Sequence, residues 1–114
     1  MNNETVTVLV HRCRMEINLE PFFDKSTLAN IRKLFRYVLK EPWRNTETIN
    51  LLGEWLTARV AYTKDDLYTE EKRAIERAYN KKQLMNVKHA KAKYDRYSKI
   101  LAAFEGLKTK NGIL

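Results

Sequence analysis

Cysteine, proline and glycine are scarce in this 114-residue chain, which has one, two and three of them respectively. The single cysteine, Cys13, excludes an internal disulfide and any metal site built from several cysteines. The opening residues lack the layout of a secretory signal, and no apolar run approaches the roughly 20 residues that span a bilayer. We therefore expect a cytoplasmic protein in a reducing compartment, with no membrane partner.

The sequence also lacks the motifs that carry common catalytic chemistry. It contains no HExxH, GxSxG, P-loop or dinucleotide-binding pattern. Its two histidines, His11 and His89, are far apart, and in the strand arrangement predicted below His11 and Cys13 face opposite ways. Cys13 is therefore interpreted as a structural residue, and we predict no enzyme activity, no metal and no cofactor.

Positive charge is abundant, and it is unevenly distributed. Residues 1–68 hold ten Lys/Arg and nine Asp/Glu, a net charge of +1, whereas residues 69–114 hold twelve and five, a net charge of +7. The two sums give the +8 of the whole chain. This asymmetry favours a polyanionic partner for the C-terminal half, either nucleic acid or an acidic protein or membrane face. The simpler alternative is a lysine-rich helix face that only contacts water.

The first twenty residues alternate in a β-like pattern that changes phase. Val6, Val8 and Val10 are apolar at even positions, whereas Cys13, Met15, Ile17 and Leu19 are apolar at odd positions. A β-hairpin over about 5–19, turning at His11-Arg12, would bring both sets to one face. A bulge near His11 in a single bent strand is the alternative, because His-Arg lacks the usual turn residues.

Two amphipathic helices of medium length are predicted next. Apolar residues recur at helical spacing over about 26–40, with Ser26 as the expected N-cap and Pro42 as the stop. A second apolar stripe follows over about 46–61, and Thr46 can cap it. Gly53 lies inside this second helix, where it suggests the close approach of another backbone.

A long or broken helix is predicted over about 64–105, starting with a capping box at Thr63 and Asp66 and ending at Gly106. Residues 69–105 contain neither proline nor glycine, which favours one continuous helix. The apolar pattern nevertheless changes phase between 80 and 86, so two helices that meet there remain the alternative. The second phase is spaced as in a heptad seam, and its members are Val87, Ala90, Tyr94, Tyr97, Leu101 and Phe104.

Together these elements predict an α+β fold, mostly α, in a single domain over 1–114 with a frayed tail at 108–114. The predicted functional site is the run of bases on the last helix, which has one acid, Asp95, among seven bases. We predict that these bases bind nucleic acid. They are Lys81, Lys82, Lys88, Lys91, Lys93, Arg96 and Lys99.

The predicted function is that of a small basic nucleic-acid-binding or nucleoprotein-accessory protein, with DNA and RNA equally open. The alternative is a protein–protein adaptor or inhibitor that docks through the 87–104 seam or the β-hairpin edge onto an acidic partner or a nucleic-acid-handling enzyme. A homodimer is also left open. The tyrosines Tyr79, Tyr94 and Tyr97 could stack on bases if exposed, but at seam spacing they are more typical of a core.

Overall fold

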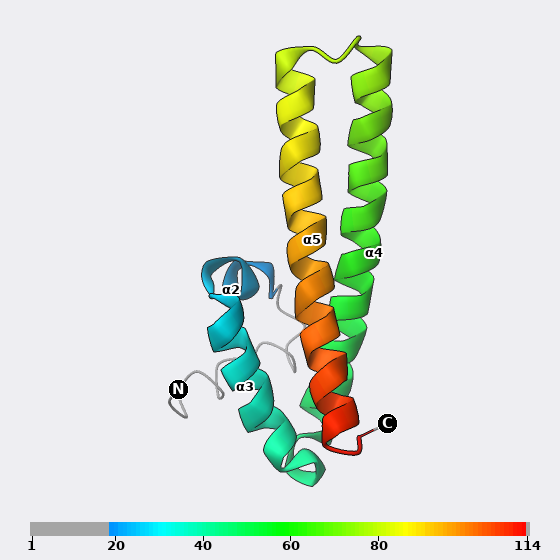
Figure 1. The fold of residues 1–114 in the computed structure, drawn as a ribbon. Helices are drawn as coiled ribbons and strands as arrows, with labels where there is room; N and C mark the ends of the chain where they lie inside the picture. The colour runs from blue at the N-terminus through cyan, green and yellow to red at the C-terminus, as the bar shows by residue number, and fades with distance from the viewer. Residues whose placement is uncertain (1–18, 114) are drawn as a thin grey trace. The chain divides into compact units, whose positions relative to one another are not determined.

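The computed structural model describes residues 19–113, and they form helices joined by short turns (Figure 1). The elements are α2 (Glu20–Lys25), α3 (Leu28–Lys40), the 3₁₀ helix η1 (Pro42–Arg44), α4 (Thr46–Glu76) and α5 (Lys81–Lys110). The described part of the chain is 87% helical and contains no strand, so the α+β prediction is wrong. The β-hairpin predicted over about 5–19 lies, apart from Leu19, outside the described residues.

Proline explains one part of this error. Pro21 was expected to end a β region, but it occupies one of the first two positions of α2. A proline is tolerated there because the amide it lacks has no partner inside the helix. Leu19, predicted as the last strand residue, is instead the N-cap of α2 with backbone angles of φ −89° and ψ −5°.

The described residues divide into two compact units. Unit 1 comprises 1–55 and 102–114, and unit 2 comprises 56–101, so α4 and α5 each contribute to both. The predictions of a single domain and of a frayed tail at 108–114 stay predictions, although α5 itself continues to Lys110.

Unit 1 is built around large apolar side chains. Phe23 of α2 stacks on Trp55 of α4 with ring centroids 5.6 Å apart, and it lies 6.1 Å from Phe35 of α3. Phe35 meets Phe104 of α5 edge to face at 5.0 Å. These aromatic contacts therefore join all four helices within unit 1, each at a separation typical of favourable ring pairs.

Helix α3 follows its sequence prediction closely, with a one-residue change at its start. Its buried face consists of Ile31, Leu34, Phe35, Val38 and Leu39, as the helical spacing indicated. The N-cap is Thr27 rather than Ser26, because the Thr27 hydroxyl accepts a hydrogen bond of 3.2 Å from the amide of Asn30. The helix ends at Lys40, before Pro42, as expected.

Unit 2 is a helical hairpin whose arms come from α4 and α5. The predicted helix end near 61 and the predicted capping box at Thr63 are wrong, because α4 continues without a break to Glu76. Thr63 lies inside α4, where its buried hydroxyl donates to the carbonyls of Arg59 and Val60 at 3.0 Å. A mid-helix threonine can satisfy its hydroxyl in this way without ending the helix.

The chain turns between α4 and α5 at residues 77–80, close to the predicted phase change, so 64–105 is not one helix. Ala78 and Tyr79 both have positive φ, at 54° and 55°. The Tyr79 amide donates to the carbonyl of Ala74 at 2.8 Å, which satisfies a carbonyl that the helix end leaves open. Asn80 then starts α5, since its side-chain oxygen accepts from the Gln83 amide at 2.9 Å.

Candidate nucleic-acid interface

The α5 arm has one buried face and one exposed face within unit 2. Gln83, Ala90 and Tyr97 are buried and lie seven residues apart, so they share one position of a heptad. Lys81 and Lys88 are exposed and also lie seven residues apart, on the other side of the helix. The seam prediction is therefore confirmed at Ala90 and Tyr97.

The remaining seam residues divide between burial and partial burial. Phe104, which belongs to unit 1, is buried, whereas Val87, Tyr94 and Leu101 are half-buried. Ile100 is buried without having been predicted. The expectation that the tyrosines are core residues holds for Tyr97, which is fully buried. It does not hold for Tyr79, in the turn, which is 57% exposed.

The seven predicted site residues all lie on the α5 arm, but their exposure differs. Lys81, Lys82, Lys88, Lys91 and Lys99 are exposed, whereas Lys93 and Arg96 are half-buried and each makes a polar or ring contact. At 1.5 Å per residue, the exposed row from Lys81 to Lys99 extends over about 27 Å. Asp95 is the one acid in this stretch, so the outer face of the arm carries nearly pure positive charge.

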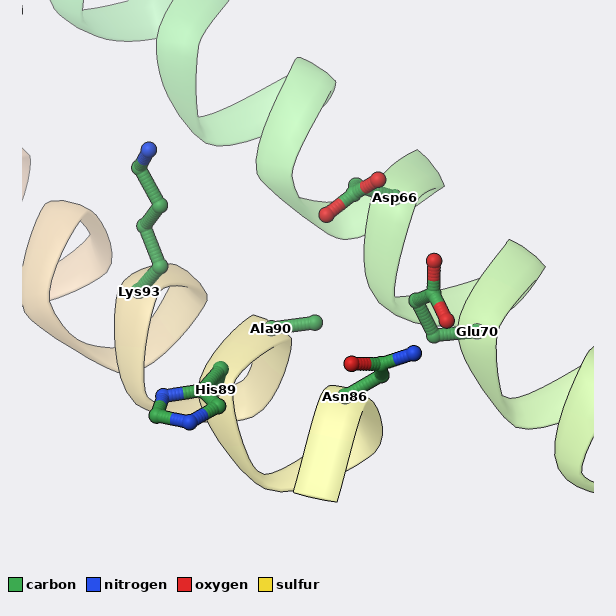
Figure 2. Close-up of a pocket in the computed structure, with 6 residues that line it drawn as sticks. All are labelled: Asp66, Glu70, Asn86, His89, Ala90 and Lys93. Carbon is green, nitrogen blue, oxygen red and sulfur yellow. The ribbon is translucent and has the colours of Figure 1, made fainter. Parts of the chain in front are cut away.

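Lys93 faces a different environment from the exposed lysines. It lines an open hollow of about 280 Å³ in unit 2, together with Asp66, Glu70, Asn86, His89 and Ala90. Figure 2 shows Asp66 and Glu70 on α4, with Asn86 and Ala90 of α5 projecting toward them. Two carboxylates in this hollow disfavour a phosphate there, so Lys93 is the least suited of the seven bases to bind one.

Sequence reasoning missed a polar contact inside the hairpin seam. Gln83 is 1% exposed, and its amide nitrogen donates to the Glu70 carbonyl at 3.1 Å and to the Glu70 carboxylate at 2.7 Å. Arg77 donates to the Gln83 side-chain oxygen at 3.4 Å, and Arg73 pairs with Glu70 at 3.1 Å. The heptad spacing of Gln83 with Ala90 could have revealed it, but a glutamine does not count toward an apolar pattern.

Cation–π contacts hold the opposite end of the hairpin. The Arg59 guanidinium lies 4.8 Å from the Tyr62 ring centroid and 5.7 Å from that of Tyr97. Contacts within about 6 Å of a ring centroid are attractive. Since Arg59 lies on α4 and Tyr97 on α5, this cation links the two arms, and Tyr97 serves the seam.

An exposed apolar set near the turn was also missed as a group. The side chains involved are those of Ile75, Tyr79, Leu84 and Met85, each about half exposed or more. All four residues lie close to the turn at 77–80 along the chain, and the apolar periodicity of the sequence did not single them out as a group.

Residues 19–113 contain no group of three His, Cys, Asp or Glu residues that could hold a metal ion. None of the described helices has the length and apolarity needed to cross a membrane.

Comparison of the chain with known protein families, with curated proteins and with solved structures finds no match. The function must therefore be argued from the site itself.

Proposed function

We propose that this protein binds nucleic acid through phosphate contacts from the outer face of the α5 arm. The observation that carries the proposal is the set of five exposed lysines on a face with one acid, Asp95. They are Lys81, Lys82, Lys88, Lys91 and Lys99. Lysines on a solvated helix attract phosphate by charge and release the counterions condensed on the nucleic acid, which favours binding without regard to sequence.

The inner face of the arm supports this assignment. Gln83, Ala90 and Tyr97 are buried, so the helix is held by its seam and need not rearrange to present its lysines. Binding of this kind depends steeply on salt. If each exposed lysine neutralises one phosphate of a duplex, the slope of log K against log[salt] is about −4.5.

The test is duplex binding measured by fluorescence anisotropy between 50 and 200 mM salt, since a salt series counts the phosphates neutralised. We expect the Lys88→Gln/Lys91→Gln variant to bind more weakly, with a slope shallower by about 2. The matched control is Lys64→Gln/Lys72→Gln, which removes the same charge from exposed lysines of the α4 arm. Absence of binding at 50 mM salt, or equal changes of slope in both variants, would contradict the proposal.

A protein–protein adaptor is the second candidate function, and the exposed apolar set favours it. Ile75, Tyr79, Leu84 and Met85 provide apolar area near the turn, next to Lys81 and Lys82. An acidic protein surface with an apolar centre would complement them. The 87–104 seam has less support as the docking surface, because Ala90, Tyr97 and Phe104 are already buried in this chain. The variant Leu84→Ser/Met85→Ser would then abolish partner binding without changing duplex affinity.

A further inference from the structure

Unit 1 carries a second basic surface, on α3, that the charge totals of the sequence concealed. Helix α3 contains four bases and no acid. All four are exposed, and the opposite face of the helix is buried in the core of unit 1. They are Arg32, Lys33, Arg36 and Lys40. Between Lys25 and Thr46 the sequence has one acid, Glu41, and it is half-buried.

Two aromatic side chains accompany these bases. Tyr37 lies on the exposed face of α3 and is 46% exposed, and Trp43, three residues after Lys40, is 72% exposed. Exposure on this scale is unusual for tryptophan, whose large apolar ring is mostly covered in folded proteins. The row Arg32, Arg36 and Lys40 follows an i, i+4, i+8 spacing along one side of the helix, with Tyr37 beside it.

The backbone that carries Trp43 is held in place by hydrogen bonds. The Asn45 side chain donates to the carbonyl of Val38 at 3.0 Å, near the end of α3. The Asn45 amide donates to the Pro42 carbonyl at 3.1 Å, and the Thr46 hydroxyl donates to the same carbonyl at 3.0 Å. Trp43 is therefore presented from a turn anchored to α3, which lowers the entropy cost of placing its ring against a ligand.

We infer that this surface, made of Arg32, Lys33, Arg36, Tyr37, Lys40 and Trp43, binds single-stranded nucleic acid. Unstacked bases expose flat faces that stack on aromatic rings and on guanidinium planes, while lysine and arginine contact the phosphates between them. A base-paired duplex keeps its base faces stacked, so it offers the phosphates but not the faces. The inference concerns unit 1 and therefore does not depend on the function proposed for α5.

An anionic lipid surface is the competing ligand, and the burial of α3 disfavours it. A helix that lies in a membrane interface inserts its apolar face among the lipids. The apolar face of α3, including Ile31, Leu34 and Val38, is buried inside unit 1. The exposed groups include the planar guanidiniums of Arg32 and Arg36 and the rings of Tyr37 and Trp43, which match nucleobases better than acyl chains.

Tryptophan emission and anisotropy with labelled oligonucleotides test the inference. The probes are oligo(dT) and oligo(U) of ten nucleotides, a matched duplex, and phosphatidylserine vesicles. We expect both single strands to quench the emission, and Trp43→Phe to identify Trp43 as the source, because the other tryptophan, Trp55, is stacked on Phe23. The relative affinities for oligo(dT) and oligo(U) would show whether the surface prefers single-stranded DNA or single-stranded RNA.

Substitutions separate this surface from the lysines of α5. We expect Trp43→Ala to weaken single-strand binding about tenfold, the loss of one stacked base, and to leave duplex affinity unchanged. Trp43→Phe should recover most of that loss, because it keeps a ring. Arg36→Gln/Lys40→Gln should make the single-strand salt slope shallower by about 1.4. Circular dichroism confirms that each variant remains helical.

Three outcomes would overturn the inference. One is single-strand affinity that is equal in Trp43→Ala and the unsubstituted protein. Another is a weakening that is equal for duplex and single strand, which indicates a general loss of structure. The third is quenching by vesicles but not by oligonucleotides, which identifies a membrane surface. If Lys88→Gln/Lys91→Gln leaves duplex binding intact while Trp43→Ala weakens single-strand binding, the function proposed for α5 fails and this inference stands.

Discussion

The two units bury very different side chains, although both are made of helices. Unit 1 buries large apolar residues, including Phe23, Phe35 and Phe104, and its ring contacts involve α2, α3, α4 and α5. Unit 2 buries a set in which small and polar side chains are prominent, namely Leu56, Thr63, Ala74, Gln83, Ala90, Tyr97 and Ile100. Since apolar burial is the main driving force of folding, most of the stabilisation per residue should lie in unit 1.

The two arms of unit 2 also differ in net charge. The α5 arm from 81 to 101 carries seven bases and one acid, whereas the α4 arm from 56 to 76 carries four bases and five acids. Opposite net charge on the two arms attracts them, and the Gln83–Glu70 contact sets how one arm aligns with the other. A buried polar contact can specify register in this way at some cost in stability.

The largest effect should come from the core of unit 1. We expect Phe35→Ala to lower the free energy of unfolding by about 3–5 kcal/mol, because it removes the contacts with Phe23 and Phe104 and leaves a cavity. Urea unfolding followed by circular dichroism measures the loss. Lys33→Ala, on the exposed face of the same helix, is the control and should change the value by less than about 0.5 kcal/mol. Similar losses in the two variants would break the comparison.

A smaller and more local effect is expected in unit 2. Gln83→Ala removes the buried amide that donates to the Glu70 carbonyl and carboxylate, and should cost about 1–3 kcal/mol, since both half-buried acceptors then lose this partner. Hydrogen exchange should accelerate in residues 65–90 and stay unchanged in α3, because local opening follows local stability. Leu84→Ala, at the exposed neighbouring position, should have little effect on either. Equal acceleration in both units would show that they open together.

The smallest effect is a gain in stability at Gly53 of unit 1. A Cβ added there would lie 3.5 Å from the Phe104 ring, an ordinary contact, so no close backbone approach requires the glycine. Gly53→Ala should raise the free energy of unfolding by up to about 1 kcal/mol, because alanine is the better helix former. Gly106→Ala, which meets nothing within 4 Å, is the control for propensity alone. A gain at Gly106 with a loss at Gly53 would mean that Phe104 cannot accommodate the methyl group.

Much of the helical structure could be predicted from periodicity. The buried face of α3 and its end before Pro42 follow from apolar spacing and from the backbone limits that proline imposes. The break at 77–80 could be located only approximately, by the change of phase, because its residues include no proline or glycine. The prediction that Thr63 caps a helix was wrong because a threonine can cap a helix or lie inside one, and local sequence does not distinguish the two positions.

One of the two candidate sites could be predicted from the sequence, and the other could not. The lysines of α5 could be found by counting charge, because seven bases and one acid stand together in the sequence from 81 to 99. The basic face of α3 could not, since the acids elsewhere in residues 1–68 reduce the net charge of that half to +1. Net charge sums over distance along the chain, whereas a ligand meets only the charges that share a face.

The sequence by itself determined the amphipathic character of the helices, the seam positions Ala90 and Tyr97 and the concentration of lysine after residue 80, because each is a pattern among residues close together in the chain. Tertiary structure alone decided which side chains remain exposed. It buried Gln83 against Glu70, placed Lys93 at a hollow that two carboxylates also line and left Trp43 in solvent. Exposure depends on what the rest of the chain brings alongside a residue, and that information lies at no single position of the sequence.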